Sequence, residues 1–235
     1  MGARLERPVR FHSVRSVKKE QMAEKVVIGN AELWHGDCRE VLPLLPAHDL
    51  LLTDPPYGIY ACGGKWGHKS ELQWDKEAAD NEAQFLAAGR VQIVWGGNYF
   101  RLPPSRGWLA WRKPDRVPSA ADFELAWTSM DMNARLIDQT IAATNAERVG
   151  HPTQKPLRVM AWSLSFAPDA QTVCDPFMGS GTTGVACAHL GKAFTGIERE
   201  RKYFDIACER ISRAQAQGTL LPPEPPRECV QEGLL

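Results

Sequence analysis

Asp54-Pro55-Pro56-Tyr57 is the segment of this chain whose residue types are best suited to bind a flat, polar ring. Proline fixes φ and lacks an N–H, so we expect a stiff loop in which carbonyl groups have no partners from the chain. A carboxylate and such a carbonyl can accept the two N–H bonds of an amino group, while a phenol stacks on the ring. The segment predicts that Asp54 and the Pro55 carbonyl hold an exocyclic amine and that Tyr57 stacks; a buried, purely structural Tyr57 is the alternative.

A second segment, Asp175-Pro-Phe-Met-Gly179-Ser-Gly181-Thr-Thr, has the composition of an anion-binding turn between a strand and a helix. The glycines let the backbone bend and let a ligand approach closely, and free N–H groups at a helix start favour a carboxylate or phosphate. Glu198 ends the next apolar run, where an acidic side chain can accept hydrogen bonds from ribose hydroxyls. These residues predict a site for a nucleoside with an anionic tail. Thr182 and Thr183 are also helix-capping types whatever the ligand.

The run from Gly179 to Gly184 also matches the G-x-G-x-x-G pattern of dinucleotide-binding enzymes. In that pattern the first glycine follows the strand almost directly, whereas here four residues, 175–178, intervene. An oxidoreductase also has no need of the loop at 54–57. We therefore favour a nucleoside site over a dinucleotide site.

Both segments must lie at the carboxyl ends of parallel strands, where open α/β sheets place their binding sites. Apolar runs alternate with stretches of helical period, which predicts a doubly wound α/β fold with a mostly parallel seven-stranded sheet. Two strands have no helix between them and form a hairpin, so one strand near the edge is antiparallel. We expect strands at 32–36, 50–54, 91–95, 109–112, 124–128, 172–175 and 194–198, and helices at 39–45, 76–88, 156–166, 183–190 and 203–215.

The composition suits a single domain. The chain has 235 residues, is 43% hydrophobic and carries no net charge, which argues against a uniformly basic nucleic-acid binder but not against a local basic patch. No apolar stretch is long enough to span a bilayer. The six cysteines show neither C-x-x-C pairing nor zinc spacing, so we expect free thiols and no metal site. We expect a flexible basic arm at 1–27, one domain over 28–217 and a proline-rich disordered tail at 218–235.

Taken together, the two segments resemble the catalytic and cofactor motifs of the S-adenosylmethionine-dependent amino-methyltransferases of DNA, which modify adenine N6 or cytosine N4. His151-Pro-Thr-Gln-Lys155-Pro resembles the stretch that precedes the cofactor motif, and weaker matches extend the resemblance over nearly all of 31–215. The catalytic motif comes first, which is similar to the permuted, β-type order of the DNA enzymes. Look-alikes that methylate guanine N2 in RNA, or a glutamine amide in proteins, carry their Pro-Pro-Tyr loop after the cofactor motif. The resemblance implies a class I methyltransferase-like fold.

The resemblance also implies a role for each matching residue. Asp54, Pro55, Pro56 and Tyr57 would form the catalytic site, with the target base flipped out of the duplex. The cofactor, S-adenosyl-L-methionine, would be bound by Asp37, His151, Lys155, Asp175, Phe177, Gly179, Ser180, Gly181, Thr182 and Glu198. Two alternatives stay open. Asp37 is equally suited to cap the helix that follows it, and His151 and Lys155 can belong to an ordinary loop.

The implied macromolecular partner is DNA, in the cytoplasm of a prokaryote or encoded by a phage. The candidate DNA contacts are Lys65, Trp66, His68, Lys69, Arg112 and Lys113. An exposed loop without DNA contacts is the alternative for the first four, and solvated charges for the last two. Residues 130–150 are too few for a recognition domain, so we expect a short or lax recognition site, or a homodimer that completes the interface. The family more often has aspartate at position 54 in adenine N6 enzymes and serine in cytosine N4 enzymes. Adenine is favoured, with cytosine N4, or an amine or amide of RNA or protein, as alternatives.

Overall fold

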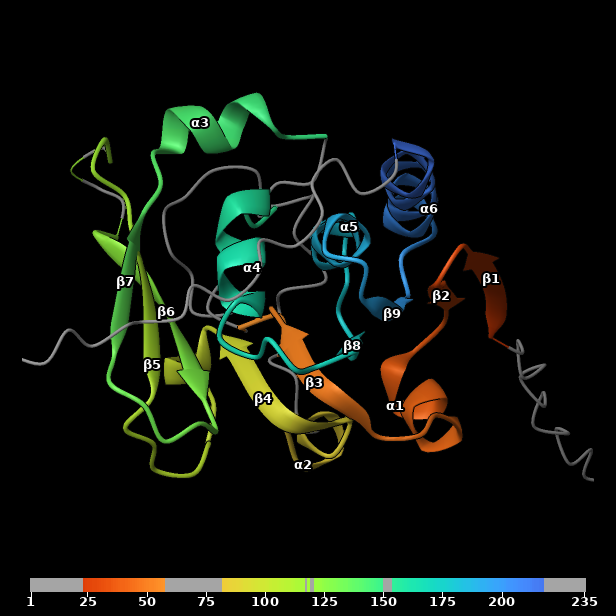
Figure 1. Ribbon diagram of the computed structural model, residues 1–235, viewed down its shortest axis with the longest axis horizontal. Helices are drawn as coiled ribbons and strands as arrows, with labels where there is room; N and C mark the ends of the chain where they lie inside the picture. The colour runs from red at the N-terminus through yellow and green to blue at the C-terminus, as the bar shows by residue number, and fades with distance from the viewer. Residues whose placement is uncertain (1–22, 58–81, 117, 119–120, 150–153, 218–235) are drawn as a thin grey trace, which may run out of the picture.

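The fold is a single mixed β-sheet covered by helices on both faces (Figure 1). The computed structural model describes residues 23–57, 82–116, 118, 121–149 and 154–217. Within these residues the sheet has nine strands in the order β1-β2-β9-β8-β3-β4-β6-β5-β7. The strands are β1 (Glu24–Ile28), β2 (Ala31–His35), β3 (His48–Thr53), β4 (Gly89–Trp95), β5 (Trp108–Arg112), β6 (Phe123–Thr128), β7 (Arg135–Asp138), β8 (Thr172–Asp175) and β9 (Ala193–Glu198).

The two strands that precede the chemically promising segments pair directly at the centre of the sheet. β3 and β8 are parallel, with Leu50 opposite Val173 and Leu51 opposite Cys174, and all four side chains are fully buried. A strand that is covered on both faces needs a continuous apolar run, which is what residues 50–52 provide. Since parallel neighbours end at the same edge, this pairing brings the segments at 54–57 and 175–183 together.

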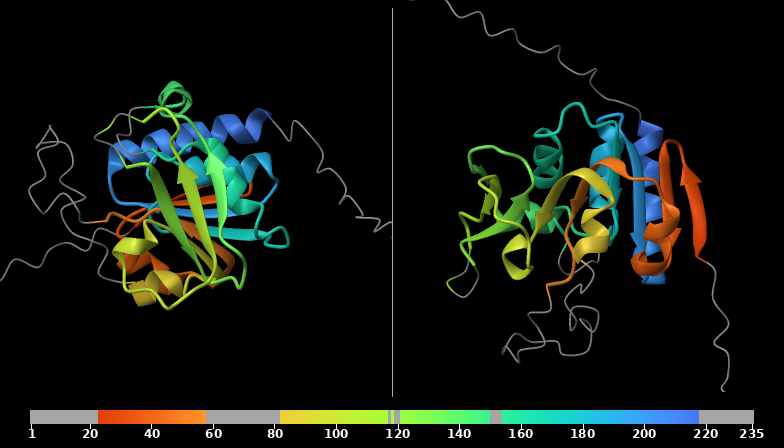
Figure 2. Two further views of the ribbon diagram at one scale, coloured as in Figure 1. Left: turned by 90° about the vertical axis from the view of Figure 1, so that its left-hand side faces the viewer. Right: turned by 90° about the horizontal axis from the view of Figure 1, so that it is seen from below.

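The helices divide between the two faces of the sheet, as the views in Figure 2 show. α4 (Leu157–Leu164), α5 (Thr182–His189) and α6 (Arg201–Gln217) pack side by side on one face. The short α1 (Cys38–Val41) and α2 (Glu82–Leu86) lie on the other, and α3 (Ile141–Ala146) follows β7. The 3₁₀ turns η1 (Leu42–Leu44) and η4 (Gly97–Tyr99) complete the assigned helices. Each face has its own apolar cluster, one built on Met160, Phe204 and Ile211 and the other on Val41 and Phe85.

The predicted fold class is confirmed, and each of the seven predicted strands is present. β6 is antiparallel to β4 and to β5, as expected of the hairpin. The strand count requires a correction, because β1 and β7 raise it from seven to nine. Four of the five residues of β1, 24–27, were assigned to the flexible arm. A two-residue Gly29-Asn30 turn folds β1 back on β2, with Gly29 at a φ of 57°. β7 was missed because only Ile137 of its four residues is buried.

The helices follow the predicted pattern with shifted ends. α3 was not predicted; its first turn is capped by the Asp115 carboxylate, which accepts bonds from the N–H groups of Ile141 and Ala142 at 2.6 and 2.9 Å. Within the described residues, no helix has the length and apolar character needed to cross a bilayer.

Candidate active site

The two predicted motifs meet at the carboxyl edge of β3 and β8. Thr53, the last residue of β3, donates a hydrogen bond from its hydroxyl to Asp175 Oδ1 at 2.7 Å. Asp175 ends β8 and is only 2% exposed. A single bond therefore ties the base of the first loop to the base of the second, and fixes their relative position before any ligand binds.

The first loop folds Tyr57 back over Asp54. The Tyr57 hydroxyl donates to Asp54 Oδ1 at 2.5 Å, and the Tyr57 ring stacks on Tyr99 with centroids 4.9 Å apart. Gly96, which directly follows β4 and is the N-cap of η4, has a φ of 69°, and a Cβ atom there would overlap the Tyr57 ring. Glycine at this position therefore serves both an unusual backbone conformation and the close approach of an aromatic ring.

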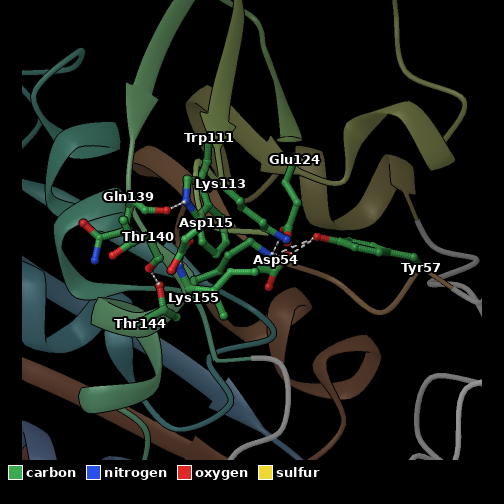
Figure 3. Close-up of polar contacts among 11 residues, drawn as sticks. Asp54, Tyr57, Trp111, Lys113, Asp115, Glu124, Gln139, Thr140, Thr144 and Lys155 are labelled. Carbon is green, nitrogen blue, oxygen red and sulfur yellow. Dashed lines mark hydrogen bonds and ion pairs between the residues drawn. The ribbon is translucent and has the colours of Figure 1, made fainter. Parts of the chain in front are cut away.

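A buried cluster of charges surrounds the Asp54 carboxylate (Figure 3). The Lys155 ammonium lies 2.6 Å from Asp54 Oδ1 and 3.1 Å from Glu124 Oε2, and donates to the Tyr57 hydroxyl at 3.0 Å. The second oxygen of Glu124 accepts from Lys113. Lys155 is 7% exposed, and the Lys113 side chain is 14% exposed. The four charges come from four separate parts of the chain and sum to zero.

The charge states in this cluster depend on one another. Burial raises the pKa of Asp54, and the Lys155 charge opposes this. Burial by itself would lower the pKa of Lys155, but Asp54 and Glu124 raise it well above its usual value. Burial also works against ionisation of Glu124, yet the charges of Lys155 and Lys113 lower its pKa to about 2. Lys155 and Glu124 are therefore charged throughout the physiological range.

The second loop is built around the buried Asp175 carboxylate. It accepts bonds from the Thr183 hydroxyl at 2.6 Å and the Phe177 N–H at 3.1 Å, besides the bond from Thr53. Burial raises the pKa of Asp175 to about 6, although these hydrogen bonds act in the opposite direction. The Phe177 ring lies edge-to-face on Phe85, with centroids 5.9 Å apart.

Glycines and an acidic side chain shape the turn that follows. Gly179 and Gly181 have φ values of 52° and 81°, and Gly181 is the N-cap of α5. Glu198, at the end of β9, accepts the Gly179 N–H at 3.0 Å and the Glu200 N–H at 2.7 Å. Burial raises the pKa of Glu198 to about 7, although the bonds from the Glu200 and Gly179 N–H groups lower it.

One residue that we did not predict holds this turn in place. Arg210, from α6, donates from its guanidinium to the Ser180 carbonyl at 2.6 Å, to the Ser180 hydroxyl at 3.1 Å and to the Thr182 hydroxyl at 3.2 Å. The capping role expected of Thr182 and Thr183 is wrong, because Gly181 holds the N-cap position. Their hydroxyls instead bond to Arg210 and Asp175.

The predicted cofactor residues Asp175, Phe177, Gly179, Ser180, Gly181, Thr182 and Glu198 all belong to this edge. Asp37 caps α1, and its carboxylate accepts the Arg39 N–H at 2.9 Å. The helix-capping role given as the alternative for Asp37 is therefore observed, and its contact with the cofactor stays a prediction. Lys155, expected beside the cofactor, has its ammonium group on the Asp54 carboxylate, and its cofactor contact stays a prediction.

Two of the six candidate DNA contacts, Lys113 and Arg112, lie within the described residues. The Lys113 ammonium pairs with Glu124 and lies over the Trp111 ring, 4.6 Å from the centroid; its side chain is 14% exposed, and its DNA contact stays a prediction. Arg112 is exposed and forms an ion pair with Asp138 at 2.5 Å, so its DNA contact stays a prediction. Lys65, Trp66, His68, Lys69 and the cofactor candidate His151 lie outside the described residues.

Glu124, Tyr99 and Arg210 were missed as parts of the site. Glu124 offered a signal, because a single acidic residue stands inside the otherwise apolar run Phe123–Thr128. No cluster of three or more metal-ligating side chains occurs in the part of the chain that the structure describes.

Two curated bacterial proteins match this chain over short segments. The type II methyltransferase M2.LlaDCHI of Lactococcus lactis subsp. cremoris is 41% identical over 69 residues, which are 29% of this chain and 26% of that protein. The type II methyltransferase M2.DpnII of Streptococcus pneumoniae is 44% identical over 62 residues, 26% of this chain and 23% of that protein. The chain thus aligns with about a quarter of the length of each.

Solved structures match over most of the chain. The M1.HpyAVI–SAM complex is 25% identical, with a TM-score of 0.52 over 77% of this chain and 99% of that one. The PvuII cytosine-N4-specific DNA methyltransferase is 17% identical, with a TM-score of 0.54 over 81% of this chain and 93% of that one, and shows a shared fold. The model of the N6_N4_Mtase family, described as DNA methylase, matches residues 92–209. This match covers half of the chain and includes β8, its glycine turn and Glu198, and by it the chain belongs to the N6_N4_Mtase family of DNA methylases.

Proposed function

We propose that this protein is a DNA methyltransferase that transfers the methyl group of S-adenosylmethionine to an exocyclic base amine, with adenine N6 as the target. The observation that carries the proposal is the shared edge of β3 and β8. There the Asp54 carboxylate can accept hydrogen bonds from an amine. Beside it, the Asp175–Thr183 turn and Glu198 are suited to bind a nucleoside with an anionic tail. The hydrogen bond between Thr53 and Asp175 joins the two segments. Family membership and the structural likeness to the M1.HpyAVI–SAM complex support the same cofactor.

The residues of the turn fit such a cofactor. Gly179 and Gly181 leave room for close approach of the methionine carboxylate to the start of α5, where N–H groups are available. The half-buried Glu198 carboxylate is suited to accept hydrogen bonds from the ribose hydroxyls. Phe177 presents an aromatic ring for the adenine. When bound, S-adenosylmethionine supplies a methyl group on a positively charged sulfur, so no metal is required.

The catalytic loop acts on the nucleophile. An exocyclic amine is a poor nucleophile because its lone pair is conjugated with the ring. Hydrogen bonds from its two N–H groups to the Asp54 carboxylate and the Pro55 carbonyl would turn the lone pair out of the ring plane. The nitrogen then forms a bond to the methyl carbon as the carbon–sulfur bond breaks, the electron pair stays on sulfur, and the methylated nitrogen loses one proton to water. Alignment of this kind can lower a barrier by about 7–11 kcal/mol.

The base must reach this loop from outside a duplex stack, so we propose that it is flipped out at a cost of a few kcal/mol. The Tyr57 ring, backed by Tyr99, would supply the stacking surface. The aspartate at position 54 supports adenine over cytosine.

Asp54→Ala tests the proposal. We expect the variant to lose methyl transfer and to bind S-adenosylhomocysteine almost as tightly as the wild type, because the carboxylate contacts the base and not the cofactor. Methyl transfer is measured by incubation with mixed-sequence DNA, followed by nucleoside mass spectrometry, and binding by calorimetric titration.

The same assay identifies the substrate. N6-methyladenine supports the proposal as stated, N4-methylcytosine changes the base, and methylation of RNA but not DNA rejects a DNA substrate. Equal loss of methylation and of cofactor binding in Asp54→Ala would contradict the role given to Asp54.

A further inference from the structure

Lys155 is placed where the proposed reaction gives it no evident role. The methyl donor carries one positive charge, which passes from sulfur to the amine nitrogen during transfer, so a second positive charge beside them is unfavourable unless it has another purpose. Lys155 is nevertheless buried, and its ammonium reaches Asp54, Glu124 and Tyr57 at distances between 2.6 and 3.1 Å. A charge that is buried at this cost and paired on three sides is held in a defined position.

The carboxylate that it touches needs a counter-charge. Asp54 accepts an N–H bond most strongly when it is ionised, because its protonated form is a weaker acceptor and carries an O–H donor. The groups that face Asp54 are Lys155 from the segment before α4, Glu124 from β6, Asp175 from β8 and Tyr57 from its own loop. Burial and Glu124 favour the protonated form of Asp54, and Lys155 is the cation among these groups that opposes them.

The geometry also divides the two oxygens of Asp54. The bonds from Tyr57 and Lys155 both end on Oδ1. Glu124 binds the same ammonium group, and Lys113 in turn binds Glu124. Lys155 is therefore shared between two carboxylates and is not paired with Asp54 alone. Lys155 directly precedes Pro156, the N-cap of α4, and a residue before proline is restricted to an extended backbone, which fixes the direction of approach.

We propose that Lys155 is a positioning residue for the methyl acceptor: it keeps the Asp54 carboxylate charged, holds its rotation through Oδ1, and leaves Oδ2 to receive the N–H of the target amine. Glu124 and Lys113 position Lys155 and prevent it from neutralising Asp54 completely. This inference rests on the proposed function for its chemical meaning, but the ionisation of Asp54 can be measured without any reaction.

The first test is a titration of Asp54 by carbon-13 NMR of protein labelled at the aspartate carboxyl carbons, with the signal assigned through Asp54→Asn. In Lys155→Met, a variant of similar length without charge, we expect the pKa of Asp54 to rise by about 1–3 units, because a neighbouring cation lowers an aspartate pKa by that amount. In Glu124→Gln, which keeps a hydrogen-bond acceptor for Lys155, we expect the pKa of Asp54 to fall, because a neighbouring negative charge is lost.

Lys192→Met is the matched control. Lys192 is 9% exposed and donates to the carbonyls of Pro168 and Ala170, at the opposite end of β8, so its loss removes a buried ammonium without touching Asp54. We expect this variant to lose stability and to leave the titration of Asp54 unchanged. Thermal unfolding of all variants shows whether each is folded at the temperature of the titration.

The second test is the pH profile of single-turnover methyl transfer. Because charged Asp54 is the active form, the acid limb of Lys155→Met should move to higher pH by the same shift as the titration. Its rate deficit should therefore approach about 10- to 1000-fold at a pH below both pKa values, for a shift of 1–3 units, and should shrink toward pH 9. Its affinity for S-adenosylhomocysteine should stay within about twofold of the wild type.

Three outcomes would overturn the inference. Lys155→Met could leave the titration of Asp54 unchanged, or it could lower the rate by the same factor at every pH. It could also lower the cofactor affinity as much as the rate, which would assign Lys155 to cofactor binding. If the wild type methylates no nucleic acid, the proposed function fails, and the NMR titration still decides whether Lys155 keeps Asp54 charged.

Discussion

Glu198 combines two requirements that conflict in the ligand-free protein. Its carboxylate must be ionised to accept the hydroxyls of a ribose strongly, yet burial raises its pKa to about 7. Binding of a diol donor favours the ionised form, so cofactor binding should release a proton from Glu198 near neutral pH.

We therefore expect the affinity for S-adenosylhomocysteine to rise from pH 6 to pH 8, by up to about tenfold per unit below the pKa of Glu198. Calorimetric titration in two buffers of different ionisation enthalpy measures both the affinity and the released proton. Glu198→Gln should bind more weakly at pH 8 and show little change with pH. A slope in this variant equal to that of the wild type would assign the proton to another group.

Residue by residue, the sequence was most informative where a single loop carries its own chemistry. The Asp54–Tyr57 loop and the Asp175–Thr183 turn could be predicted because strand, proline or glycine, and functional side chain are contiguous. The pairing of Lys113 with Glu124 could not be predicted because Glu124 lies eleven positions further on, in the strand next to β5. The position of Lys155 depends on how α4 packs against the sheet, and local pattern does not encode that contact.

At the scale of elements, the cofactor turn depends on the contact between α5 and α6. A Cβ atom on Gly181 would meet the Ala207 backbone at 3.0 Å, and one on Gly184 would meet Ile211 Cδ1 at 2.4 Å and Phe194 Cε1 at 2.7 Å. α6 can therefore approach α5 only where α5 lacks side chains, and this approach brings Arg210 onto the turn.

Gly181→Ala should weaken cofactor binding and destabilise the fold by more than the about 1–2 kcal/mol that a left-handed backbone costs an ordinary residue, because α6 must also move. Gly191→Ala is the matched control: Gly191 has a φ of 67° but open space around its Cβ position, so only the backbone cost applies. Chemical denaturation gives the two stabilities, and titration with S-adenosylhomocysteine gives the affinities. Equal losses of stability in the two variants would argue against a steric role for the helix contact.

The strands were easier to predict than the helices. Central strands are buried on both faces, and this leaves apolar runs such as residues 50–52 and 193–197 that can be read directly. The edge strands β1 and β7 bury little, so their sequences carry a weak pattern. α3 has a local N-cap in Thr140, whose hydroxyl accepts the Ala143 N–H, but it also depends on the Asp115 carboxylate, which is distant in the sequence.

At the scale of the whole molecule, the carboxylates at the active edge couple stability to pH. Burial raises the pKa of Asp175 to about 6 in the folded chain, from the ordinary aspartate value of 3.8. The folded state therefore binds this proton more tightly than the unfolded state. The corresponding contribution to the free energy of unfolding, about 3 kcal/mol, is fully present below about pH 4 and is lost as the pH rises through about 6.

Asp175→Asn should remove this dependence, so that the free energy of unfolding falls less between pH 5 and pH 7.5 than it does in the wild type. Urea denaturation at the two pH values measures the difference. Asp131→Asn, at a side chain that is 86% exposed, is the control and should follow the wild type. Identical slopes in all three proteins would show that the proton is not held by Asp175.

The first hairpin of the domain and its last helix run along each other. Arg201, at the start of α6, pairs with Glu24 in β1 at 2.5 Å, and Gln215, near the end of α6, bonds to Asn30. The start of β1 and the end of α6 are therefore separated by about the length of this helix, roughly 25 Å at 1.5 Å per residue. A bridge of about eight extended residues would close that gap. New chain ends could then be placed between α3 and α4 without breaking a strand pair. In that chain the Asp175–Thr183 turn would come before the Asp54–Tyr57 loop in the sequence, and both would keep their positions in the fold. The position of the chain ends thus decides which of the two motifs comes first in the sequence, and the fold is compatible with both orders.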